Sequence, residues 1–85
     1  MRESDSYLRM LSVEIRNEVT RQRFAGKTTS KGEPMSLSAI ARTLDPPVSR
    51  VAVYLVIDGK AESSRIKAAI ERELGKAYWI RKDAA

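Results

Sequence analysis

Basic side chains are the most prominent chemical groups in this 85-residue chain. Sixteen lysines and arginines accompany eleven aspartates and glutamates, which gives a formal net charge of +5. The excess is concentrated between residues 16 and 31, where a single acid, Glu18, lies among five bases: Arg16, Arg21, Arg23, Lys27 and Lys31. Groups of this kind bind phosphate and release the counterions condensed on a polyanion. The charge favours a nucleic-acid partner, although many small basic proteins bind nothing anionic.

Catalytic chemistry has few candidates in this sequence. The chain contains no histidine and no cysteine, so the commonest general base and the strongest nucleophile are missing. The carboxylates are spread along the chain, and none has the spacing of a metal site. We therefore predict that the protein is not an enzyme and has no cofactor. The lack of cysteine, the polar N-terminus and the absence of a long apolar run predict a cytoplasmic protein.

A corner in the chain is the most informative structural feature. Residues 41 to 51 read ARTLDPPVSRV, and two consecutive prolines cannot lie inside a helix. The β-branched residues of the following VAVYLVI favour a strand, which could pair with its twin in a dimer. A helix with Ser49 as its N-cap is the interpretation that we prefer, because a lone strand leaves its backbone groups unpaired.

The first half of the chain predicts one long helix and a loop. Apolar residues at helical spacing place a helix over about residues 5–24: Leu8, Leu11, Ile15 and Val19. Ser4 or Asp5 can cap its start, and Gly26 is suited to its end. The glycines and hydroxyl residues of the basic segment 26–35 indicate a flexible loop.

The second half predicts three shorter helices in the same domain, which spans residues 1–85. Ser36 caps the first, and the prolines end it before a short helix that stops at Asp58. The last helix covers residues 61–74, with Ser63 or Ser64 as its cap and Gly75 as its stop. The tail, residues 76–85, carries three apolar side chains that we expect to pack on the core: Tyr78, Trp79 and Ile80.

Two stretches of the chain resemble a known family. SLSAIARTLDPPVSRVAVYL, followed by a charged turn and IKAAIERELGKAYWI, is similar to the Ner-like DNA-binding regulators of Mu-type phages and their bacterial relatives. The resemblance covers about residues 35–82. It departs at Asp45, where a glycine is usual, and in the longer first helix and loop. It implies an all-α, four- to five-helix bundle of the lambda-repressor-like type, containing a helix-turn-helix. It also implies a phage or prophage repressor that occupies an operator in double-stranded DNA.

In such a fold, the helix after the corner enters the major groove. We expect Val51, Tyr54 and Leu55 to face inward, which leaves Val56 and the candidate base contacts outward: Ser49, Arg50, Ala52 and Val53. Arg50 is the strongest of these, because a guanidinium can pair with guanine through two hydrogen bonds. Six residues are candidates for phosphate contacts: Ser36, Ser38, Arg42, Lys27, Lys31 and Lys60.

Other functions stay open from the sequence alone. A helical protein-interaction module, such as a phage-encoded adaptor or inhibitor, could dock on a host protein through Val53, Val56 and the aromatic tail. Non-specific binding to nucleoid DNA or RNA would also suit the charge. A single helix-turn-helix reads few base pairs, so a homodimer, at least on DNA, would help to reach useful affinity. Tyr7 and Met10 on the first helix are candidates for its contact.

Overall fold

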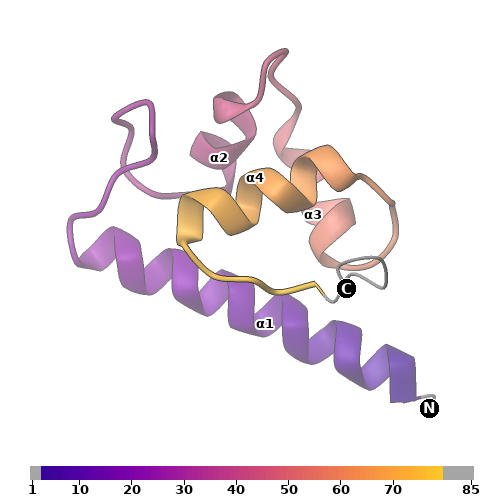
Figure 1. Ribbon diagram of the computed structural model, residues 1–85. Coiled ribbons are helices and arrows are strands. Elements are labelled where there is room, and N and C mark those ends of the chain that lie inside the picture. Colours follow the sequence, from indigo (N-terminus) through magenta and orange to yellow (C-terminus); the bar gives the residue numbers. More distant parts are fainter. Residues whose placement is uncertain (1–2, 80–85) are drawn as a thin grey trace.

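The computed structural model describes residues 3–79, with side chains from Met10 onward. This part of the chain contains four helices. They are α1 (Glu3–Phe24), α2 (Leu37–Thr43), α3 (Arg50–Ile57) and α4 (Ser64–Leu74). Figure 1 shows α2, α3 and α4 on one side of the long α1. Residues 3–79 contain no strand, only an isolated bridge between Thr28 and Pro34. The predicted all-α fold is confirmed, and the stretch after the prolines is a helix.

Serine caps begin the three shorter helices. The hydroxyl oxygens of Ser36, Ser49 and Ser63 accept hydrogen bonds from backbone N–H groups three residues later, at 3.0, 3.1 and 3.3 Å. Each cap satisfies an N–H group that has no partner within the helix. The caps at Ser36 and Ser49 are the predicted ones, and Ser63 is the one used of the two that were expected for α4.

Two helix boundaries differ from the sequence prediction. α1 begins at Glu3, so Ser4 and Asp5 lie within the helix and do not cap it. α4 begins at Ser64 instead of residue 61, because Ser63 is its cap. Its end is as predicted: Gly75 adopts the left-handed conformation, φ 75°, and its N–H donates to the carbonyl of Glu71.

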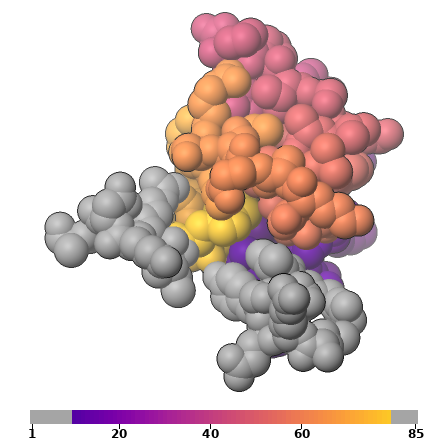
Figure 2. Space-filling model, turned by 90° about the vertical axis from the view of Figure 1, so that its right-hand side faces the viewer, coloured from indigo at the N-terminus to yellow at the C-terminus, as the bar shows by residue number. Residues whose placement is uncertain are grey.

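One apolar core joins the four helices. Its largest fully buried side chains come from all four helices and from the connection before α2: Ile15, Met35, Ile40, Val53, Ile57 and Ile70. Tyr78 is buried with them and Trp79 packs against the cluster, as expected for the tail, whereas Ile80 lies outside the described residues. Figure 2 shows the last described residues, in yellow, beside α1 in indigo. No helix within residues 3–79 has both the length and the hydropathy needed to cross a bilayer.

A buried acid links α1 to the end of α4. The Glu18 side chain is only 7% exposed and accepts hydrogen bonds from Arg21, Gln22 and Lys76. Gln22 also donates to the carbonyl of Leu74, at 3.0 Å. The hydrogen bonds from Arg21 and Gln22 are the main reasons why the pKa of Glu18 falls to about 2, against an opposing effect of burial.

We expect acid to destabilise the fold through Glu18. Its ordinary pKa is 4.5 and its pKa in the fold is about 2, so the stabilisation is fully present above the ordinary value and is lost as the pH falls through the folded value. The Glu18→Gln variant cannot titrate there. Its Tm should be lower than that of the wild type at neutral pH but should decrease less between about pH 5 and about pH 2. Equal decreases in thermal melts of the two proteins would contradict this role of Glu18.

Candidate nucleic-acid interface

The two faces of α3 are exchanged relative to the sequence prediction. Val53 and Ile57 have no exposed surface and Val56 is 2% exposed, whereas Val51 is 58% and Leu55 39% exposed. The prediction that Val53 and Val56 face outward, and that Val51 and Leu55 face inward, is therefore wrong. Because its side chain is buried, Val53 is not a candidate base contact.

The cause of this exchange is an ambiguous pattern. Residues 51, 54 and 55 and residues 53, 56 and 57 are both apolar sets at i, i+3 and i+4, two residues apart on the same short helix. Each set could form the buried stripe of an amphipathic helix. The second set, which ends with Ile57 next to the helix end at Asp58, is the one that the fold buries.

Arg50 lies at the exposed start of α3 beside an aromatic ring. Its Cζ atom is 5.8 Å from the centre of the Tyr54 ring, and the Cζ atom of Arg16 from α1 is 5.0 Å from the same ring. Contacts of this kind hold a guanidinium against a ring face. The i, i+4 spacing of Arg50 and Tyr54 is visible in the sequence, but the approach of Arg16 is not.

Arg16 is itself held by a network that sequence reasoning missed. Its Nη2 atom lies 3.1 Å from Oδ1 of Asp58, the residue after α3, and its Nε atom donates to the Ser12 hydroxyl. Ser12 in turn donates to Asp58 at 2.8 Å. Burial raises the pKa of Asp58, but the hydrogen bonds from Ser12 and Arg16 outweigh it and leave the pKa below its ordinary value. The carboxylate therefore stays charged and fixes Arg16 beside Tyr54.

The other candidate residues near α2 are partly engaged within the protein. Arg42 is exposed, but its Nη2 atom lies 2.8 Å from Oε2 of Glu33. This hydrogen-bonded arginine lowers the pKa of Glu33. Ser36 uses its hydroxyl oxygen as the α2 cap, and Ser38 is half-buried. A contact between Arg42 and a phosphate would compete with its ion pair to Glu33.

The basic loop is tied to the rest of the fold at several points. Within it, the N–H of Thr29 donates to the carbonyl of Glu33 at 2.8 Å, and Thr29 is buried. The hydroxyl and N–H of Ser30 both donate to the Glu73 carboxylate of α4, at 2.7 and 2.8 Å. These hydrogen bonds tie the loop to the fold, whereas its composition predicts a flexible loop. Lys27 and Lys31 project from it as exposed side chains.

The candidate residues do not form one continuous surface. The loop carrying Lys27 and Lys31 lies beyond the C-terminal end of α1, on the opposite side of Figure 1 from α3. Lys60 follows the C-terminal end of α3, whereas Ser49 and Arg50 lie at its start. The two ends of this eight-residue helix are about 12 Å apart, at a rise of about 1.5 Å per residue. Ala52 is half-buried. The structure thus brings together Ser49 and Arg50, adds Arg16, and separates them from the loop lysines.

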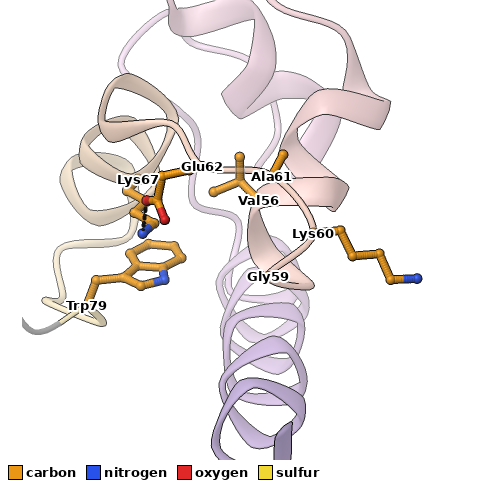
Figure 3. A pocket seen from close by; sticks show the side chains of 7 residues that line it. All are labelled: Val56, Gly59, Lys60, Ala61, Glu62, Lys67 and Trp79. Atoms are coloured by element: carbon orange, nitrogen blue, oxygen red, sulfur yellow. Dashed lines mark hydrogen bonds and ion pairs between the residues drawn. The ribbon is translucent and has the colours of Figure 1, made fainter. Parts of the chain in front are cut away.

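A small hollow opens between the α3–α4 connection and the tail, with a volume of about 370 Å³. Figure 3 shows Lys67 above the ring of Trp79 and paired with Glu62, while Lys60 points away from them. The Nζ atom of Lys67 is 5.6 Å from the Trp79 ring centre. No group of three or more potential metal ligands occurs among the side chains that the structure describes. The side chains that line the hollow thus include a paired charge and an aromatic ring.

Comparison with known proteins gave no match to a family model, to a curated protein or to a solved structure. The resemblance to the Ner-like regulators thus stays a hypothesis.

Proposed function

We propose that the protein is a sequence-specific regulator that binds double-stranded DNA, with α2 and α3 as a helix-turn-helix and α3 as the helix that enters the major groove. In this proposal it acts as a Ner-like phage or prophage repressor by occupying its operator. The observation that carries the proposal is the exposed face of α3, where a guanidinium at the start of the helix adjoins two apolar side chains, Val51 and Leu55.

The chemistry of this face suits the edges of base pairs. Arg50 can donate two hydrogen bonds to O6 and N7 of guanine, and Val51 and Leu55 can pack against thymine methyl groups. Ser49 lies beside Arg50 and is exposed, so its hydroxyl can bond a base or a phosphate. Val51 and Leu55 take the role that the sequence prediction gave to Val53.

The corner between α2 and α3 supports the same proposal. Residues 44–49 connect the helices, and the N–H of Val48 donates to the carbonyl of Ala41 at 3.2 Å. Ala41 is 2% exposed, which suits a small residue where two helices approach closely. Arg65 of α4 donates a hydrogen bond to the carbonyl of Pro46 at 2.8 Å and thereby links the corner to α4. A corner held by these hydrogen bonds would keep the angle between α2 and α3 fixed, as direct readout of bases requires.

The alternative of a protein-interaction module loses the surface on which it was based. It was based on exposed Val53 and Val56 and on the aromatic tail; Val53, Val56 and Tyr78 are buried, and Trp79 is half-buried. Non-specific binding to nucleic acid remains the main competitor of the proposal. Footprinting on the DNA that flanks the protein's own gene would separate the two, because a specific regulator protects a defined segment and a non-specific binder protects none.

The salt dependence of binding should reveal the role of the loop lysines. Lys27→Ala and Lys31→Ala should each weaken binding to all duplexes alike. If each lysine neutralises one phosphate, each substitution should also reduce the magnitude of the negative slope of log K against log salt by about 0.9. Fluorescence anisotropy with a protected duplex and a scrambled one, over a salt series, measures both effects. Thr28→Ala, an exposed position of the same loop whose substitution leaves the charge unchanged, is the matched control. An unchanged slope in both lysine variants would place the loop away from the DNA.

A further inference from the structure

The outer face of α1 carries an apolar stripe that the fold leaves uncovered. Met10, Val13 and Phe24 are 71%, 53% and 86% exposed, and they are three of the five large apolar side chains that lie open among the described residues. Asn17 and Thr20 are exposed between them. The five positions follow one another at intervals of three, four, three and four residues, which is the a/d spacing of a coiled coil.

This stripe is separate from the face of α1 that packs on its own domain. The buried residues of α1 within the described side chains are Leu11, Ser12, Ile15, Glu18, Val19 and Gln22, and none of them belongs to the stripe. Figure 1 shows the other helices on one side of α1. The stripe carries no charge, and the charged side chains flank it at the e and g positions: Glu14, Arg16, Arg21 and Arg23.

We propose that α1 pairs with α1 of a second copy of this chain, in an antiparallel arrangement with two-fold symmetry. The a/d layers of an antiparallel pair then place Val13 against the partner's Phe24 and Asn17 against the partner's Thr20, each layer occurring twice. A small side chain meets a large one at both ends, and two polar groups meet in the centre. The four positions from Val13 to Phe24 thus find their complements in the same sequence, so this part of the stripe suits a second copy of the chain, whereas Met10 lies beyond the paired layers.

The flanking charges favour the antiparallel direction. In this register Glu14 lies beside the partner's Arg21, twice; Arg21 also pairs with Glu18 of its own helix, and its side chain is 67% exposed. A parallel pair would instead place Arg16 beside the partner's Arg21, two like charges. The other edge of the antiparallel pair brings Arg16 near the partner's Arg23, but Arg16 is already paired with Asp58. Two heptads form a small interface, so association should be weak and concentration-dependent. The inference does not depend on DNA binding.

Sedimentation equilibrium of the full chain tests the association. We expect a monomer–dimer equilibrium that Phe24→Ser shifts at least tenfold toward the monomer. The variant should keep the wild-type Tm at concentrations where both proteins are monomeric, because Phe24 is 86% exposed. Val51→Ser, which removes an exposed apolar side chain from α3, should leave the equilibrium unchanged. A chain that stays monomeric at millimolar concentration, or a dimer that Phe24→Ser does not weaken, would overturn the proposal.

Disulfide trapping tests the direction, and the chain has no native cysteine to interfere. Val13→Cys and Phe24→Cys proteins, mixed under mild oxidation, should form the mixed disulfide in preference to either homodimer. In an antiparallel pair residue 13 faces residue 24 of the partner. The two copies of residue 13 are then separated by eleven residues along the helix axis, or about 16 Å, which is too far for a disulfide. Preferential trapping of the Val13→Cys homodimer would show parallel helices and would overturn the proposed arrangement.

Discussion

Replacing Arg50 by alanine is expected to reduce the preference for the operator over a scrambled duplex by about 1–3 kcal/mol, the usual worth of a bidentate arginine–guanine pair. The reason lies in the position of Arg50, exposed at the start of α3 with its guanidinium against the Tyr54 ring. The ring limits the conformations of the guanidinium, so less entropy is lost when it binds a base edge. Competition binding with the two duplexes at one salt concentration measures the preference directly.

The matched variant for this test is Arg50→Lys. Lysine keeps the positive charge but lacks the planar fork of donors, so it should retain affinity for scrambled DNA while losing most of the preference for the operator. Lys31→Ala, at an exposed candidate phosphate contact, should instead lower affinity for both duplexes alike. If Arg50→Ala weakened both duplexes equally and Arg50→Lys restored both, Arg50 would be a phosphate contact and the direct readout proposed for α3 would be wrong.

The second large effect concerns stability and uses two valines on the same helix. Val53→Ala should lower the free energy of unfolding by about 2–3 kcal/mol, from about 0.8 kcal/mol per buried methylene and an added cavity cost. Val51→Ala should change it by less than about 0.5 kcal/mol, because Val51 is 58% exposed. Both substitutions remove the same atoms and change helix propensity equally, so the difference between them measures burial alone.

Urea denaturation followed by circular dichroism measures both free energies of unfolding. In a domain of this size, a loss of 2–3 kcal/mol corresponds to a decrease in Tm of roughly 10–20 °C. Val51→Ala should also weaken binding to a thymine-containing operator while leaving Tm unchanged, which would separate its role from that of Val53. Equal destabilisation by the two substitutions would contradict the orientation of α3.

Helix ends were the features that could be predicted from neighbouring residues. Ser36 and Ser49 cap their helices by reaching N–H groups three residues away, and Gly75 ends α4 through its own backbone conformation. Such interactions involve residues within one turn, so the order of residue types specifies them. The stop at the two prolines has the same local origin. For this reason the all-α fold and the approximate limits of α2, α3 and α4 could be inferred from the sequence.

Candidate residues were harder to predict, because their role depends on which way they face. Arg50 and Ser49 are exposed, as predicted, although the apolar set that was expected to face inward on the same helix was the wrong one. The loop lysines are also exposed, but their distance from α3 follows from the path of the chain between α1 and α2. Arg16 could not be placed beside Tyr54 from sequence, since 37 residues separate the two along the chain.

The sequence by itself determined the helical segments, the caps at Ser36 and Ser49, the stop at Gly75 and the basic charge. Each of these depends on residue type and on separations of a few residues. Only the tertiary structure decided which face of α3 is buried, because two apolar sets compete on that helix and the other three helices select between them by packing. The same packing brings Arg16 to Asp58 and Ser30 to Glu73, and it leaves Met10, Val13 and Phe24 on the outer face of α1 exposed.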